Sequence, residues 1–296
     1  MTFYTLSTVL QLAFLYGVIA IAVAFTFRIV GFPDLTPDGA FVVGAAIAAV
    51  VVRSGHNAAL AIVLGAGAGG LSGVTTAMLH AKLGVSKLLS GILVTLALYS
   101  ISLRVMMTSN LSLLNVQTFM ATVARGSGAA PILATAAICC TTLSLAIWLL
   151  RTRLGISLRA TGDSETALEV RGRLRQPYYF IGLAFANAIV AAGGVIVALY
   201  QGFADVSMGT GLVVTCLAAV VMGETVLRPQ GIVSLMLSPV LGMFVYQLVL
   251  ALALRAGFTP ADLKISTAVI AIAFIGLDRL RTQRGEIGRQ IGNRAV

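Results

Sequence analysis

Residues 31–51 read GFPDLTPDGAFVVGAAIAAVV, and residues 202–222 read GFADVSMGTGLVVTCLAAVVM. The two stretches align without a gap, and both open on Gly-Phe-x-Asp followed by an aliphatic residue and a hydroxyl residue. Matches between apolar residues arise easily by chance, so the shared polar opening carries the comparison. We interpret the two stretches as copies of one internal repeat.

The chain around the repeat has the composition of an integral membrane protein. Its 296 residues are 58% hydrophobic and 10% charged, with a mean hydropathy of +0.99. A helix needs about 20 apolar residues to cross a bilayer, and the apolar runs predict an all-α integral membrane fold with about nine transmembrane helices. The first run lacks a preceding basic residue and a following cleavage site, so we expect it to remain as a helix. The expected spans are 6–27, 40–52, 57–79, 88–107, 131–150, 178–200, 210–223, 231–254 and 265–277.

The position of the repeat predicts two halves of opposite direction. Each copy directly follows a long apolar run, and an odd number of spans separates the start of the first unit from the start of the second. We therefore expect the inverted-topology architecture that many transporters share. The halves are residues 6–107 and 177–278, joined by a linking span at 131–150 and a cytoplasmic loop at 151–176, with a basic cytoplasmic tail at 279–296.

The excess of basic residues sets the expected orientation. The formal net charge is +10, and most of the 20 Lys and Arg residues fall in loops on one side of the predicted membrane. The positive-inside rule then places the N-terminus outside and the C-terminus in the cytoplasm of a bacterial inner membrane. Basic residues that crowd beside spans argue against a nucleic-acid partner.

The expected helix after each Asp is short. Residues 40–52 and 210–223 would each span about 20 Å, whereas the hydrocarbon core is about 30 Å thick. Broken helices are tolerated at membrane depth where protein or a water-filled cavity satisfies the backbone, and a pair of them points to a substrate site. We predict that half-helix N-termini help to hold a polar or anionic substrate group. The expected interrupting residues are Pro33, Pro37, Gly39, Gly209 and Gly211.

The candidate substrate pathway consists of the aromatic, acidic and hydroxyl residues of the two motifs. The acidic and hydroxyl residues can contact substrate or cap the half-helices, and both roles can coexist. The two aromatic residues can stack on a ligand or serve only in packing. These candidates are Phe32, Asp34, Thr36, Asp38, Phe203, Asp205 and Ser207.

The basic loop contains a short predicted helix outside the membrane. Asp163 or Ser164 can cap its start, Glu165 suits its positive first turn, and Gly172 can end it. The residues alone leave two interpretations open, an amphipathic loop lying on the surface and a docking element.

Four stretches together resemble a known family. They are residues 31–39, RTRLGISLRATGDS at 151–164, YQGFADV at 200–206 and AIAFIGLDRL at 271–280. Nearly the whole chain resembles the permease subunits of ATP-binding-cassette (ABC) importers of the branched-chain amino acid and ribose type. It is most similar to the subset associated with tryptophan-like or uncharacterised substrates.

The resemblance implies a coupling helix that docks on an ATPase subunit. It also implies two ATPase subunits that bind ATP and Mg, a second permease, taken as a second copy of this chain, and a periplasmic or lipid-anchored substrate-binding protein. The implied substrate is a small amino-acid-like or aromatic solute, and no cofactor is expected on this chain. The implied coupling residues are Gly162, Asp163, Ser164, Glu165, Ala167, Leu168, Arg171 and Gly172.

Several chemistries are excluded or disfavoured by motif. The sequence has no G-x-x-x-x-G-K-[ST] P-loop, no H-E-x-x-H and no Gly-x-Ser-x-Gly, so we expect a transport subunit without enzymatic activity of its own or a metal site. The Gly-rich residues 65–73 suggest helix packing more than phosphate binding. Glu224 lies four residues before Arg228, so an ion pair between them is expected.

The alternative function is an ion-coupled secondary transporter. Such proteins commonly place an ionisable residue deep within a span. The interiors of the long spans here carry none, although Asp34, Asp38 and Asp205 could be reassigned to that role. An importer permease would need a partner ATPase, whereas a proton- or sodium-coupled carrier would transport alone.

Overall fold

The computed structural model describes residues 3–114, 120, 122–123, 129–163 and 176–258, and this part of the chain is almost entirely helical. Seven of its helices are long and apolar enough to cross a membrane, and one apolar helix is shorter. The elements are α1 (Phe3–Ala24), continued by the π-helix η1 (Phe25–Val30), α2 (Thr36–Arg53), α3 (Ala58–Leu83), α4 (Lys87–Met106), β1 (Asn110–Ser112), α6 (Ala129–Arg151), α7 (Arg153–Asp163), α8 (Gln176–Gln201), β2 (Phe203–Asp205), α9 (Leu212–Leu227) and α10 (Ile232–Arg255).

Helices lie at eight of the expected spans, and the ninth, residues 265–277, falls outside the described part of the chain. The prediction of a short helix after the first motif is wrong. Helix α2 has 18 residues and begins at Thr36 rather than at residue 40, with Pro37 in its first turn. Proline is well tolerated there because the first amide groups of a helix have no intrahelical partner. Helix α9, with 16 residues, is the shorter of the two.

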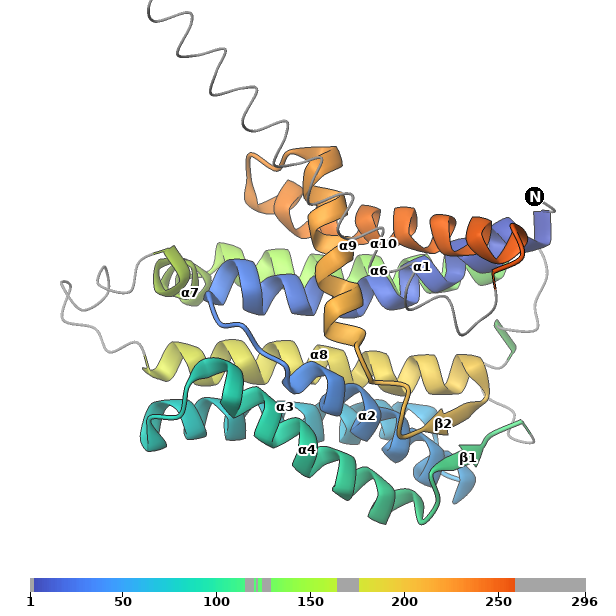
Figure 1. Cartoon of the computed structure of the whole chain (residues 1–296), viewed down its shortest axis with the longest axis horizontal. Coiled ribbons are helices and arrows are strands. Elements are labelled where there is room, and N and C mark those ends of the chain that lie inside the picture. Colours follow the sequence, from blue (N-terminus) through green and yellow to red (C-terminus); the bar gives the residue numbers. More distant parts are fainter. Residues whose placement is uncertain (1–2, 115–119, 121, 124–128, 164–175, 259–296) are drawn as a thin grey trace, which may run out of the picture.

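The helices that lead into the two motifs run in opposite directions. The hydroxyl of Tyr200, near the end of α8, donates to the side chain of Gln11, in the first half of α1, over 2.9 Å. At the other end of the pair, the ring of Phe32 lies 5.5 Å from that of Tyr179. Figure 1 shows α3 running with α1, and α10 running with α8. Equivalent helices of the two copies are therefore inverted.

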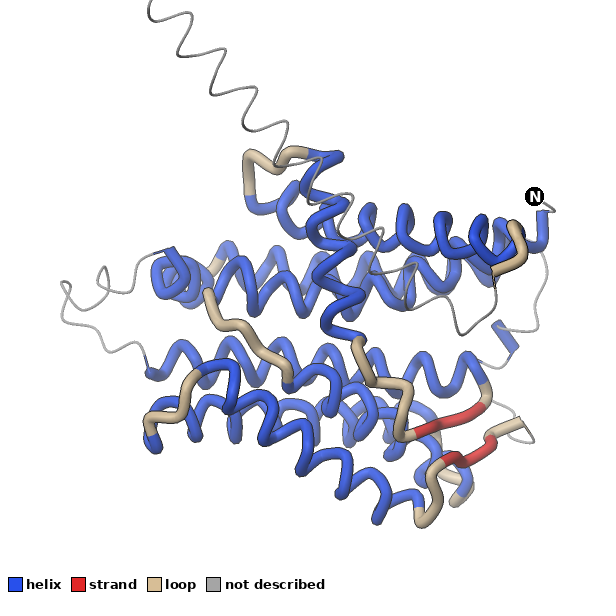
Figure 2. Tube along the Cα trace, viewed as in Figure 1, coloured by secondary structure: helices blue, strands red, loops and turns tan. Residues whose placement is uncertain are grey.

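We call α1 and α8, which precede the two motifs, the lead helices, and each packs mainly against helices of the other copy. Helix α8 lies along α2 and α3, while α1 lies along α10 and α6 (Figure 1). The result is two layers, one of α1, α6, α9 and α10 and the other of α2, α3, α4 and α8. Figure 2 shows the loop at residues 31–35 crossing from the layer of α1 to the layer of α2.

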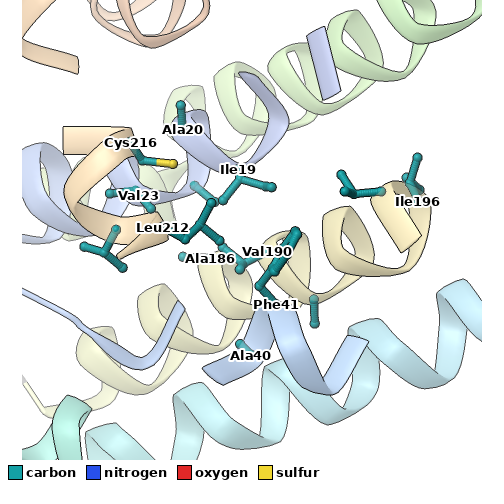
Figure 3. Packing of buried hydrophobic residues seen from close by; sticks show 14 of the residues in the cluster. Ile19, Ala20, Val23, Ala40, Phe41, Ala186, Val190, Ile196, Leu212 and Cys216 are labelled. Atoms are coloured by element: carbon teal, nitrogen blue, oxygen red, sulfur yellow. The ribbon is translucent and has the colours of Figure 1, made fainter. Parts of the chain in front are cut away.

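The core lies where the lead helices meet the helices that follow the motifs. Figure 3 shows Ile19 of α1, Phe41 of α2, Val190 of α8 and Leu212 of α9 converging there. The lead helices α1 and α8 therefore contact the helices that follow both motifs.

Glycines let the backbones of this core approach closely. A Cβ atom added at Gly44 of α2 would lie 2.0 Å from the carbonyl oxygen of Ala191 in α8. In the Gly-rich part of α3, added Cβ atoms at Gly69 and Gly73 would lie 2.3 and 2.2 Å from α8 carbonyl oxygens. These contacts agree with the packing interpretation of residues 65–73.

Candidate substrate pathway

The glycine of each motif ends its lead helix in the left-handed conformation. Gly31 has φ 65° and Gly202 has φ 79°, both in the left-handed region that favours glycine. The Gly31 amide donates to the carbonyl of Thr26, and the Gly202 amide donates to that of Ala198. The glycines therefore allow the chain to turn away from α1 and α8.

The aspartates of the two motifs form the same local turn. Asp34 Oδ1 accepts a hydrogen bond from the amide of Thr36 at 2.8 Å, and Asp205 Oδ1 accepts one from the amide of Ser207 at 2.7 Å. An Asp that bonds the amide two residues ahead initiates turns and helices. The shared sequence opening thus corresponds to a shared backbone geometry.

The first copy is buried among polar groups from three helices. Asp34 is 0% exposed, and its Oδ2 accepts from the amide of Asn187 in α8 over 2.8 Å. The Thr36 and Thr76 hydroxyls lie 2.6 Å apart, and Thr95 donates to the carbonyl of Leu35 over 2.7 Å. The first motif is therefore fixed by α3, α4 and α8.

The aromatic residue of the first copy serves in packing. Phe32 is fully buried, with ring centroids 5.3 Å from His80 and 5.5 Å from Tyr179. Lys87 lies 5.9 Å from the Phe32 ring centroid, and its ammonium group donates to the carbonyl of Gly31 over 3.2 Å. In this conformation the Phe32 ring is enclosed by protein.

The second copy lies at the surface on a two-stranded ribbon. Strands β1 and β2 are antiparallel, with Leu111 opposite Ala204, and Asn110 donates to Asp205 Oδ2 over 2.9 Å. Phe203 is 38% exposed. The hydrogen bond from Ser207 lowers the pKa of Asp205 below its ordinary value. The polar side chains of this motif therefore bond along the ribbon, whereas Ala204 and Val206 are buried in the hydrophobic core.

Asp38 joins the two copies. It sits in the first turn of α2, yet its carboxylate accepts hydrogen bonds from the amides of Val213 at 2.7 Å and Gly211 at 3.3 Å, at the start of α9. A carboxylate stabilises the positive N-terminal end of a helix. Asp38 thus caps the helix of the other copy, and the N-termini of α2 and α9 meet at this residue.

A cavity of about 290 Å³ lies beside the start of α9. A larger cavity of about 580 Å³ shares Leu12, Gln247 and Leu250 with it and extends toward the start of α1. The described lining of the smaller cavity carries amides, hydroxyls and thioethers but no charged side chain. It consists of Leu12, Tyr16, Gln201, Met208, Thr210, Leu212, Thr215, Met243, Tyr246, Gln247 and Leu250.

The seven predicted pathway residues do not form one site. Three belong to the buried cluster around Asp34, three to the surface ribbon around Asp205, and Asp38 lies between the two copies. All seven are in the described part of the chain, and the described lining of the cavities includes none of them. The sequence feature that could have indicated the cavity is the presence of two glutamines, Gln201 and Gln247, at or within apolar runs, because polar side chains in spanning segments often mark functional sites.

The predicted coupling segment is only partly described. Gly162 and Asp163 are the last two described residues of α7. The other predicted coupling residues, Ser164, Glu165, Ala167, Leu168, Arg171 and Gly172, lie outside the described residues.

The expected ion pair between Glu224 and Arg228 is wrong. Glu224 instead forms a bidentate ion pair with Arg28 in η1, in which the Arg28 Nε donates a hydrogen bond of 2.8 Å. Arg228 adopts φ 46° at the end of α9. The pair joins the ends of α1 and α9, which are distant in sequence.

Inverted helix pairs, a non-helical turn after each lead helix and a cavity whose described lining has no charged side chain are typical of a multi-pass membrane protein of the transporter class. Residues 5–277 match the family described as branched-chain amino acid transport system / permease component, and the chain belongs to that family.

Individual relatives and a solved structure resemble most of the chain. A tyrosine transport system permease protein of Clostridioides difficile (strain R20291) is 31% identical over 273 residues, covering 92% of this chain and 91% of the relative. An uncharacterized protein of Rickettsia prowazekii (strain Madrid E) is 27% identical over 264 residues, covering 87% and 91%. The structure of PsaBC from Streptococcus pneumoniae in complex with Fab shares the fold with a TM-score of 0.55 and 16% identity, covering 94% of this chain and 91% of that one.

Proposed function

We propose that this chain is the membrane-spanning subunit of an ATP-driven ABC importer that moves a small amphipathic amino acid, with aromatic amino acids preferred, into the cell. The observation that carries the proposal is the 31% identity to a tyrosine transport system permease over 92% of this chain. The uncharged cavity supports it, because tyrosine and methionine side chains with nearby amides suit a solute that has an apolar ring and polar ends.

The proposed orientation places α7 and the Arg28–Glu224 pair on the cytoplasmic side, and the β1–β2 ribbon on the outer side. The concentration of basic residues near α7 supports this orientation. The cavities then open from the outer side toward the meeting point of α2 and α9. Alternating access would follow from relative movement of the two inverted halves.

The proposed assembly has two permease chains surrounded by membrane lipid, two ATPase subunits on the cytoplasmic side and a substrate-binding protein outside. ATP and Mg would be bound by the ATPase, because this chain carries no P-loop sequence. The predicted coupling residues after α7 would form the ATPase contact.

The test is uptake by a reconstituted system. The chain would be co-expressed with a candidate ATPase and a candidate substrate-binding protein from the same organism, and proteoliposomes would be assayed with radiolabelled L-tyrosine. We expect uptake only with ATP, Mg and the binding protein present. Replacing L-tyrosine by an uncharged sugar measures substrate preference.

The same preparation tests the ion-coupled alternative. Uptake of L-tyrosine by this chain alone, driven by a pH or sodium gradient and unchanged by ATP, would overturn the importer proposal. Failure of the ATPase to co-purify with the chain would count against it as well.

A further inference from the structure

The end of α7 touches the first motif backbone to backbone. A Cβ atom added at Gly162 would lie 2.2 Å from the carbonyl oxygen of Ile29 and 3.1 Å from the amide nitrogen of Gly31. Conversely, a Cβ atom at Gly31 would lie 2.9 Å from the Cα of Gly162. The two glycines leave no room for a side chain, so movement at one backbone is passed directly to the other.

The rest of α7 is anchored beside this contact. Leu158 is 0% exposed, and the hydroxyl of Thr161 bonds the carbonyl of Ser157 within the helix. Leu158 and Val30 both lie against the same point of α8, since a Cβ atom added at Gly182 would meet each of them. Helix α7 is therefore packed against η1 and the start of α8 over its C-terminal half.

The Gly31 turn is held from a second side. Lys87, at the start of α4, donates to the Gly31 carbonyl over 3.2 Å. The turn thus lies between α7 and the hairpin of α3 and α4. From Gly31 the chain runs in only a few residues to Asp34 and then to Asp38, which caps α9.

We infer that the Gly162–Gly31 contact transmits movement of α7 to the meeting point of α2 and α9. The inference rests on the proposed function, because it assigns α7 to the face where the ATPase works. Gly162 and Gly31 are positioning residues: their backbones set the place of the turn, and the turn sets the place of Asp34 and Asp38.

Within the part of the chain that the structure describes, the glycine of the second copy has no matching contact with α7. A Cβ atom added at Gly202 would lie 3.2 Å from the side chain of Leu114. That neighbour follows the surface ribbon and is 65% exposed. Among the described contacts, α7 therefore reaches the glycine turn of the first copy and not that of the second.

The test is Gly162→Ala in the complete complex reconstituted with the ATPase and binding protein. The added methyl group must displace the Gly31 turn, so we expect assembly and ATP hydrolysis to continue while solute molecules moved per ATP fall at least about fivefold, the lower end of typical coupling effects. The matched control is Gly67→Ala on α3, where an added Cβ atom meets no atom of the described residues within 4 Å. This control should keep the wild-type ratio.

The outcomes separate the inference from the proposed function. If wild-type complexes show ATP-driven uptake and Gly162→Ala keeps the same uptake per ATP, the inference is overturned and the importer function stands. If wild-type complexes show none, the proposed function itself fails.

Should Gly162→Ala not assemble, Lys87→Gln decides, because it removes the ammonium donor to Gly31 without adding volume. We expect a smaller drop in uptake per ATP, at least about twofold against the control. An unchanged ratio in Lys87→Gln would overturn the inference.

Discussion

The two Gly-Phe-x-Asp turns have the same local hydrogen bonding but opposite surroundings. Asp34 is fully buried and bonded to Asn187 of a membrane helix, whereas Asp205 is solvent-accessible and bonded to Asn110 of a surface strand. A buried carboxylate is retained only where its acceptor positions are filled. The comparison shows that the first turn is fixed inside the helix bundle, whereas the polar groups of the second turn lie at the protein surface.

The largest expected effect is that of Asp34→Ala. The change removes the acceptor for the Thr36 amide and leaves a donor of Asn187 unpaired in the interior. We expect about 3 kcal/mol of lost stability, from one lost cap and one buried unpaired group. Thermal unfolding of the detergent-purified protein measures it, with Asp205→Ala as the matched change in the other copy. Equal effects of the two changes would refute the buried-versus-surface distinction.

An exchange of aligned residues should have the next largest effect. Gly44 of α2 aligns with Thr215 of α9. At Gly44 the helix packs directly against the backbone of α8, since an added Cβ atom would lie 2.0 Å from the carbonyl oxygen of Ala191. Gly44→Thr should destabilise the protein by about 2 kcal/mol through overpacking. Thr215→Gly, at the cavity, should cost well under about 1 kcal/mol through helix propensity. Thermal unfolding of both variants checks the order, and the reverse order would contradict the assigned packing.

The smallest expected effect is a dependence on pH at Asp205. Its pKa is lowered in the folded protein from an ordinary value of 3.8, first by the Ser207 hydrogen bond. The stabilisation is therefore present above that ordinary value and is lost as the pH falls through the lower folded pKa. Unfolding curves between about pH 6 and pH 3 should show a slightly steeper loss in the wild type than in Asp205→Asn. Identical curves would show that the carboxylate is unpaired.

Local features of the sequence predicted much of the fold. Apolar length located the helices, and the repeat at Gly31 and Gly202 located the two turns, because each depends on neighbouring residues. The predicted start of α2 at residue 40 is wrong, because Pro37 lies in the first turn, where proline does not break a helix.

The contacts between the copies could not be predicted in the same way. Asp38 caps α9 and Arg28 pairs with Glu224 only because the inverted halves bring distant helix ends together. The cavity likewise combines side chains from four separate segments, of which only Gln201 and Gln247 stand out in an apolar sequence. Long-range placement of this kind requires the assembled bundle.

The central claim is that the α7 face lies in the cytoplasm and the β1–β2 face lies outside. Single cysteines would be placed at exposed Arg153 of α7 and exposed Ser109 beside β1, in a chain whose Cys139, Cys140 and Cys216 are replaced by alanine. A membrane-impermeant maleimide should label Ser109→Cys in intact spheroplasts, and Arg153→Cys only after permeabilisation. Labelling of Arg153→Cys in intact spheroplasts, with Ser109→Cys protected, would contradict the orientation and with it the proposed direction of transport.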